Sequence, residues 1–112
     1  MITLPLPPSV NALYGGGSKQ RRFKSAGYKN WLERCPKLEP KMFKKIALRY
    51  TFYFPDKRMR DIGNYEKAVS DYLVAQNFIE DDNWDCVYRL TLVFGGIEKN
   101  SRVEIAVDGF KR

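Results

Sequence analysis

The pattern of hydrophobic and polar positions predicts four strands. Residues 2–6 are typical of a short strand stopped by prolines. In residues 44–54 apolar side chains recur at every second position, so that they fall on one face of a strand. Pro55 is expected to end this second strand, because proline cannot donate a hydrogen bond to a neighbouring strand. Residues 87–94 and 102–107 indicate two further strands joined by the turn GGIEKNS, and we expect these two to pair as a hairpin.

Two segments have apolar residues at helical spacing. The first helix is expected to begin after an N-cap at Ser25 and to end near Cys35. The second is expected to begin between Ile62 and Asn64 and to end at about Ala75 or Gln76. The element order predicts an α+β fold, a mixed four-stranded sheet with two main helices. At 112 residues, the whole chain, 1–112, is expected to form a single domain.

Charge and residue types restrict the possible chemistry. A formal net charge of +7 favours a polyanionic partner, with nucleic acid ahead of an anionic membrane surface or a merely solvated face. The chain has no histidine, which excludes Ser-His and Cys-His catalysis, and Cys35 and Cys86 lack the CxxC spacing of a zinc site. The glycines at 15–17 are not followed by the GK[ST] of a phosphate loop, and no apolar stretch reaches the length of a membrane helix. We therefore expect a cytoplasmic protein without membrane contact or organic cofactor.

Acidic and basic residues are segregated along the chain. Between Asp61 and Asp85, seven of the thirteen acids accompany a single base, Lys67, whereas residues 18–60 hold fourteen bases and three acids. Grouped carboxylates hold hard divalent cations such as Mg²⁺, and positive surface holds phosphate. The combination indicates an enzyme that cuts a nucleic-acid backbone. The helix dipole also stabilises acidic side chains near a helix N-terminus in proteins where they have no catalytic role. A purely structural role for the cluster therefore stays open.

The predicted elements suggest how such a site would assemble. Asp61 follows the end of a predicted strand, and Asp82 lies on the turn after the intervening helix, which returns the chain to that strand if the helix packs on the sheet. Lys67, about one and a half turns into that helix, would reach the same site and stabilise the transition state or protonate the leaving oxygen. The basic string 19–24 is either a solvated loop or a mobile clamp on phosphates, and we favour the clamp.

Three segments resemble one known family. ITLPLPPSVNALY at the start, RMRDIGNYEKAVSD at 58–71 and EDD at 80–82 are similar, in order and spacing, to the RusA family of phage and bacterial Holliday-junction endonucleases. The resemblance implies a small mixed α/β homodimer that binds branched DNA, the four-way junction, on a basic surface. It also implies symmetric cutting with Mg²⁺, or Mn²⁺ in its place, in DNA recombination and repair in a bacterial or phage-infected cell.

Site residues follow from the resemblance position by position. Asp61 matches the first aspartate of the family's D-x-D-N motif, Asn64 its asparagine, and Lys67 its catalytic lysine. Asp82 matches the third metal carboxylate and Asp81 its less essential neighbour. The implied catalytic residues are therefore Asp61, Lys67 and Asp82, and the two aspartates are also implied metal ligands. The residues expected to contact DNA are Lys19, Arg21, Arg22, Lys24, Lys57, Arg58, Arg60 and Asn64.

One position departs from the family pattern. Gly63 stands where the second aspartate of D-x-D-N is expected. Either the chain is an inactive variant that still binds junctions, or Glu66 supplies the missing metal ligand from the same helical face, three residues on. We favour the second account and keep Asp85 as a further spare acid. Two non-enzymatic alternatives remain, a module that binds branched or single-stranded DNA and a small adaptor that docks an acidic protein.

Overall fold

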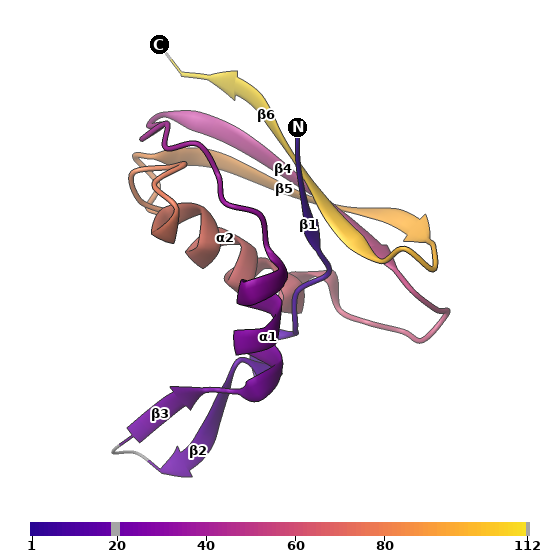
Figure 1. Cartoon of the computed structure of the whole chain (residues 1–112). Coiled ribbons are helices and arrows are strands. Elements are labelled where there is room, and N and C mark those ends of the chain that lie inside the picture. The colour runs from indigo at the N-terminus through magenta and orange to yellow at the C-terminus, as the bar shows by residue number, and fades with distance from the viewer. Residues whose placement is uncertain (19–20, 112) are drawn as a thin grey trace.

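A four-stranded mixed sheet carries the helices on one side (Figure 1). The computed structural model describes residues 1–18 and 21–111, with side chains outside residues 16–22. The α+β class, with a mixed four-stranded sheet and two main helices, is confirmed. The elements are β1 (Ile2–Pro5), η1 (Val10–Ala12), β2 (Tyr14–Ser18), β3 (Arg21–Lys24), α1 (Ala26–Arg34), β4 (Ile46–Phe54), η2 (Ile62–Tyr65), α2 (Glu66–Ala75), β5 (Val87–Ile97) and β6 (Arg102–Phe110), where η denotes a short 3-10 helix.

The strand order of the main sheet is β1-β6-β4-β5. β4 pairs antiparallel with β6 and parallel with β5, and α2 makes the crossover from β4 to β5. The expected β5–β6 hairpin is therefore wrong, because β4 lies between the two strands. The reason is the hydrophobic effect. At the start of β4, Ile46, Ala47 and Leu48 are all buried, so a central position for this strand removes the most apolar surface from contact with water.

The segment expected to be a loop around the glycine triplet forms a second, two-stranded sheet. β2 and β3 pair antiparallel and project from the main body (Figure 1). A Cβ at Gly15 would lie 3.0 Å from the Phe23 ring, so glycine permits the close approach of the two strands. Lys19 lies outside the described residues, as do the side chains of Arg21 and Arg22.

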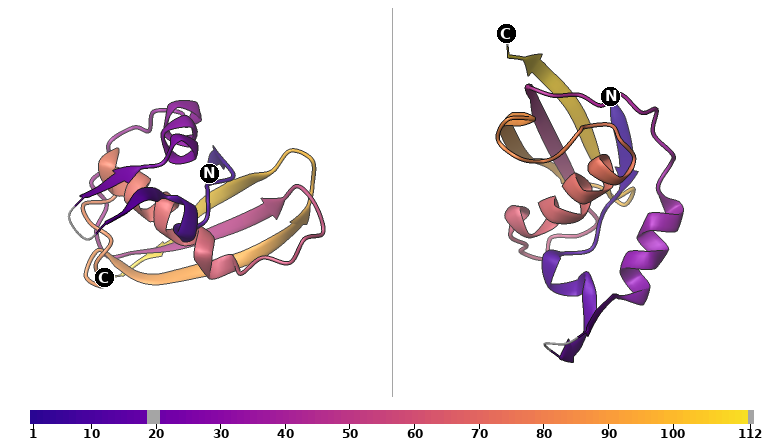
Figure 2. Two further views of the ribbon diagram at one scale, coloured as in Figure 1. Left: turned by 90° about the horizontal axis from the view of Figure 1, so that it is seen from below. Right: turned by 90° about the vertical axis from the view of Figure 1, so that its left-hand side faces the viewer.

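The first helix forms as predicted and is tied to the sheet. The Ser25 hydroxyl accepts a hydrogen bond from the Tyr28 amide at 3.1 Å, which caps α1. The Trp31 indole donates to the Pro5 carbonyl at 2.7 Å, and its ring packs edge-on against Tyr72 of α2. The two views of Figure 2 show α1 beside α2 on the same side of the sheet.

α2 provides the main cover of the sheet. Its buried residues, Val69 and Leu73 among them, share one core cluster with Leu48, Tyr50 and Phe52 of β4. Asn77, at a φ of 59°, follows the helix end in the left-handed conformation that commonly terminates helices. With nine and ten residues, neither α1 nor α2 is long enough to cross a membrane, and the described chain contains no helix that is.

Candidate active site

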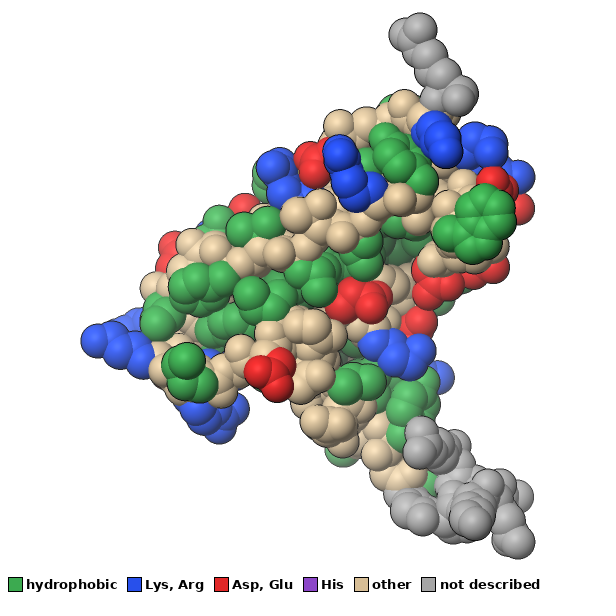
Figure 3. Space-filling view, turned by 180° about the vertical axis from the view of Figure 1, so that it is seen from behind, with side chains coloured by type: hydrophobic (Ala, Val, Ile, Leu, Met, Phe, Trp, Pro, Cys, Tyr) green, Lys and Arg blue, Asp and Glu red, His purple; other side chains and the backbone are tan. Residues whose placement is uncertain are grey.

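A pocket of about 160 Å³ opens between α2 and the first half of β5. Glu66, on the first turn of α2, and Asp82, on the turn that precedes β5, both line it. Figure 3 shows acidic side chains gathered in a hollow on this face, with a basic side chain beside them. The fold thus brings together two of the three predicted metal ligands. The complete lining is Tyr50, Glu66, Ser70, Ile79, Asp82, Val87 and Leu90.

A chain of hydrogen bonds anchors Glu66 from the core. Ser70, one helical turn after Glu66, donates its hydroxyl to the Glu66 carboxylate. The Tyr50 hydroxyl lies 2.9 Å from the Ser70 oxygen, and because the serine proton is directed to the carboxylate, Tyr50 is the donor of this second bond. Burial, and then the negative charges of Glu66 and Asp82, raise the pKa of Tyr50, so the phenol keeps its proton. Glu66 is therefore held in one orientation by buried groups.

The turn that carries Asp82 is organised by its neighbour. One carboxylate oxygen of Asp81 accepts the Asp82 amide at 2.8 Å, and the other accepts from the Asn83 side chain at 3.2 Å. Asn83 in turn accepts from the backbone of Asp85 and Cys86. Asp81 is thus occupied by the turn itself, whereas the exposed Asp82 lies at the opening of the pocket.

Most remaining acids of the cluster are neutralised by lysines. Asp85, which could have served as a spare acid, belongs to this group, and the Lys45 ammonium holds its pKa below the usual value. Among the described side chains of the cluster, Asp61, Glu66, Asp81 and Asp82 have no ion-pair partner. Asp61, Glu66 and Asp82 are the predicted metal ligands. The neutralising pairs are Lys44–Glu80 at 3.4 Å, Lys45–Asp85 at 2.9 Å and Lys67–Asp71 at 3.2 Å.

Lys67 lies nearer the helix start than expected. It is the second residue of α2 rather than one and a half turns in, because η2 forms the first turn separately. Asp71, one turn on, hydrogen-bonds the ammonium and raises the pKa of Lys67, and the charge of Asp82 contributes to the same effect. Lys67 therefore keeps its positive charge at neutral pH, near the two acids of the pocket.

Comparison with known proteins shows the family to which the chain belongs. The family model described as Endodeoxyribonuclease RusA matches residues 5–108. The chain belongs to the RusA family of endodeoxyribonucleases. It is 30% identical over 111 residues to the crossover junction endodeoxyribonuclease RusA of Shigella sonnei (strain Ss046). The aligned region covers 95% of this chain and 91% of that relative. The corresponding enzymes of Escherichia coli (strain K12) and Enterobacteria phage 82 match with the same identity and coverage.

The first residue of the RusA-like D-x-D-N segment lies outside the pocket. Asp61 occupies the N-cap position of η2, is exposed, and makes no capping bond with its side chain. Gly63 is also exposed, and a Cβ built there would meet nothing within 4 Å. Across residues 1–18 and 21–111, no three His, Cys, Asp or Glu side chains converge closely enough to hold a metal ion. The free chain thus presents two carboxylates in one pocket and a third nearby in sequence.

The expected DNA-contacting residues differ in their surroundings. Lys24, Lys57 and Arg58 are exposed, whereas the Arg60 side chain is only 8% exposed. Arg60 pairs with Asp56 at 2.9 Å and stacks over the Phe54 ring at 5.2 Å, so it stabilises the loop after β4. Asn64 is half-buried on η2. The side chains of Lys19, Arg21 and Arg22 lie outside the part of the chain that the structure describes.

Ser70 and Tyr50 also line the candidate site, although the sequence patterns did not indicate them. The available signal was the i, i+4 spacing of Glu66 and Ser70 on one helix face. The role of Tyr50 had no local signal, because Tyr50 and Ser70 meet only when α2 packs on β4.

Proposed function

We propose that this chain is an endonuclease that resolves four-way DNA junctions by metal-dependent phosphodiester hydrolysis. One observation carries the proposal: the two carboxylates of Glu66 and Asp82, without a cationic partner among the described side chains, share one pocket near a charged lysine. The relatives that match nearly the whole chain are crossover junction endodeoxyribonucleases, which supports branched DNA as the substrate.

The donor set fits a hard divalent cation. Glu66 and Asp82 offer carboxylate oxygens, which suit Mg²⁺ or Mn²⁺, and the pocket contains no softer sulfur or nitrogen ligand from its lining side chains. We propose that these two residues hold the cation and that Asp61 joins them from η2. When bound, the cation would polarise the scissile phosphate and lower the pKa of an attacking water.

The residues of the chain supply positioning and charge. Ser70 and Tyr50 keep the Glu66 carboxylate directed into the pocket, which removes an entropic cost of assembling the site. Lys67, protonated at neutral pH, offsets the charge that develops on the phosphate oxygens. The exposed Lys24, Lys57 and Arg58 bind the phosphate backbone without regard to base sequence.

Junction resolution also implies two active sites. Symmetric incision of two opposed strands requires two copies of the pocket, and a two-fold homodimer is the commonest arrangement that supplies them. We propose that the active form is such a homodimer, acting in the cytoplasm of a bacterial or phage-infected cell.

The test uses a synthetic four-way junction labelled in turn on each strand, with a linear duplex of the same sequence as control. We expect paired nicks in opposed strands of the junction with Mg²⁺, none with EDTA, and none in the duplex. Binding in a gel-shift assay should survive chelation, because it depends on the basic surface. Cleavage of duplex and junction at equal rates would contradict junction selectivity.

A second candidate function is a junction-binding protein without catalysis. Two observations favour it: Gly63 lacks the carboxylate expected at its position, and no third acid completes the pocket within the described part of the chain. Salt-sensitive junction binding without product in Mg²⁺ or Mn²⁺ would support this alternative and refute the nuclease.

A further inference from the structure

Trp84 is the most exposed aromatic residue in the part of the chain that the structure describes, at 84%. The next most exposed, Phe23, is at 58%, and the second tryptophan, Trp31, is buried at 1%. Single exposed apolar residues are common on protein surfaces, so exposure alone indicates no function. The position of Trp84 does, because it lies two residues after Asp82, which lines the candidate pocket.

The turn that carries Trp84 has a fixed backbone. The Asn83 carbonyl accepts hydrogen bonds from the amides of Cys86 and Val87 at 3.1 and 2.9 Å, which closes one turn of chain around Trp84. The Cys86 carbonyl accepts from the Ile46 amide at 2.9 Å and ties this turn to β4. An indole has only two side-chain torsions, so on a fixed backbone it loses little conformational entropy when it binds a partner.

The indole is also free of other rings. The aromatic pairs and cation–π contacts found among the side chains of residues 1–15 and 23–111 do not include Trp84. Two residues span at most about 7 Å, so the backbone of Trp84 lies within that distance of Asp82. This is about two base steps of a DNA strand, at about 3.4 Å each. A phosphate bound between Glu66 and Asp82 would therefore place a neighbouring base beside the indole.

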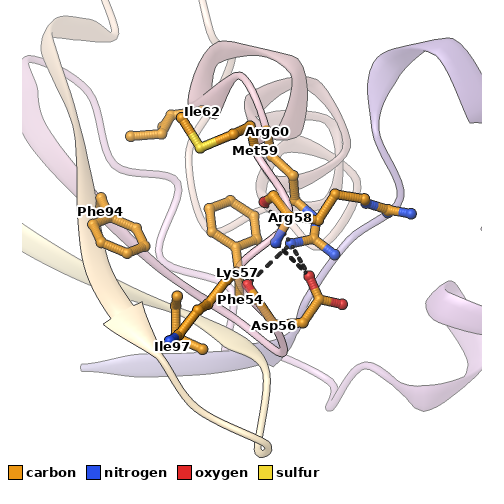
Figure 4. A pocket seen from close by; sticks show the side chains of 9 residues that line it. All are labelled: Phe54, Asp56, Lys57, Arg58, Met59, Arg60, Ile62, Phe94 and Ile97. Carbon is orange, nitrogen blue, oxygen red and sulfur yellow. Dashed lines mark hydrogen bonds and ion pairs between the residues drawn. The ribbon is translucent and has the colours of Figure 1, made fainter.

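The other end of β4 has a different character. The loop after this strand carries the exposed Lys57 and Arg58, which Figure 4 shows at a pocket of about 210 Å³. The Phe54 ring in this pocket is already covered, because the Arg60 guanidinium lies 5.2 Å from its centre and the Phe94 ring stacks on it at 6.2 Å. This end offers cations for phosphate, whereas the uncovered indole lies at the acidic end.

Branched DNA differs from linear DNA in the base faces that it exposes. A base within a duplex is stacked on both faces and must be unstacked, at a cost in free energy, before a side chain can cover it. At a four-way branch point the stack of bases is interrupted, so a base face is available without that cost. Stacking on an aromatic ring tolerates any sequence, because every base has a π face. An indole beside the pocket can thus recognise a branch without reading the sequence.

We propose that Trp84 stacks on the base face exposed at the branch point, next to the phosphate held at the Glu66–Asp82 pocket. This contact makes Trp84 a residue that selects four-way junctions over linear duplex. The inference rests on the proposed function and adds to it the side chain that recognises the branch. The basic residues supply affinity for any DNA, and the indole supplies the preference for a junction.

Tryptophan fluorescence tests the contact directly. The measurement is made in EDTA, so that the DNA stays intact. We expect the four-way junction to quench the emission of Trp84, and a saturating linear duplex of the same sequence to leave it unchanged. The variant Trp84→Phe retains only Trp31, which is buried and donates to the Pro5 carbonyl, so its emission should be the same with and without the junction.

Gel-shift titrations give the second readout. In Trp84→Ala the Kd for the junction should rise about tenfold, because one base stack is lost, whereas the Kd for the duplex should change by less than about twofold. Trp84→Phe should restore most of the junction affinity, since a phenyl ring also stacks. Phe110→Ala is the matched control: Phe110 is 56% exposed, but its ring already packs edge-on against Phe43 at 5.3 Å, so neither Kd should change.

Three results would overturn the inference. The first is equal quenching by junction and duplex, and the second is a folded Trp84→Ala variant that binds the junction as tightly as the wild type. The third is an equal loss of affinity for both DNAs, which would make Trp84 a general DNA contact. If Trp84→Ala does not fold, the quenching of the wild type decides.

Junction nicking in Mg²⁺, measured in parallel, separates this inference from the proposed function. A wild type whose Trp84 is quenched by the junction alone, but which does not cut, contradicts only the nuclease. A wild type that cuts junctions while Trp84→Ala keeps its junction affinity contradicts only the role of Trp84.

Discussion

The Ser70 hydroxyl connects the core of the protein to the candidate active site, so Ser70→Ala perturbs stability and activity by different routes. In the wild type this hydroxyl accepts from Tyr50 and donates to Glu66. Alanine removes both bonds. The expected results are a less stable protein and a Glu66 carboxylate that is no longer oriented.

The magnitudes follow from burial. Ser70 and Tyr50 are 4% and 1% exposed, so Ser70→Ala leaves the Tyr50 hydroxyl without a partner in the core, at a cost of about 1–3 kcal/mol in unfolding free energy. Tyr50→Phe should cost only about 1 kcal/mol, because Ser70 keeps Glu66 as its acceptor. In Tyr50→Phe/Ser70→Ala no buried hydroxyl is left unpaired, so the double variant should be more stable than Ser70→Ala alone.

The cleavage rates of these variants should follow a different order from their unfolding free energies. Loss of an outer hydrogen bond to a metal ligand usually costs about 10–100-fold, so we expect that loss in Ser70→Ala and in the double variant, and a much smaller one in Tyr50→Phe. The measurements are urea unfolding followed by circular dichroism and single-turnover junction cleavage in saturating Mg²⁺. A Ser70→Ala variant that is destabilised as expected but cuts at the wild-type rate would refute the positioning of Glu66.

Four further predictions concern the remaining site residues. Asp61→Asn and Asp82→Asn should each abolish cleavage and keep junction binding in a gel-shift assay, and loss of binding by folded variants would refute the separation of roles. Lys67→Ala should lower the single-turnover rate far more than the affinity, since one base among twenty matters mainly in the transition state; equal losses in both would contradict this. If the wild type cuts, Glu66→Gln should stop it. If the wild type is inert, Gly63→Asp should restore metal-dependent cutting by supplying a carboxylate, and a Cβ at 63 has room because it would meet nothing within 4 Å. An active wild type unaffected by Glu66→Gln would exclude Glu66 as a ligand. A combined neutralisation of the basic string should weaken binding to every DNA sequence and flatten its salt dependence, and an unchanged salt slope would remove the string from the interface; the positions are Lys19, Arg21, Arg22 and Lys24.

Local patterns predicted the helices and the central strand well. The Ser25 cap, the helical spacing that ends near Ala75 and the alternation before Pro55 all reflect interactions within a few residues of sequence, and the structure contains each element. The pairing of β5 with β6 was predicted wrongly because the turn between them suggested a hairpin. Strand neighbours depend on which strand has most apolar surface to bury, and that comparison involves the whole chain.

The sequence by itself determined the chemistry that this protein can perform. The absence of histidine predicts that any catalysis depends on carboxylates, lysine or a bound metal, and the acids between Asp61 and Asp85 with the surrounding bases supply such groups. Only the tertiary structure decided which acids are available. Lys44 and Lys45 pair with Glu80 and Asp85 through contacts between distant segments, and Glu66 and Asp82 line one pocket because the fold brings α2 beside the turn that precedes β5. Residue types are local properties, whereas ion pairing and burial depend on long-range packing, and so the free carboxylates became distinguishable only in the folded chain.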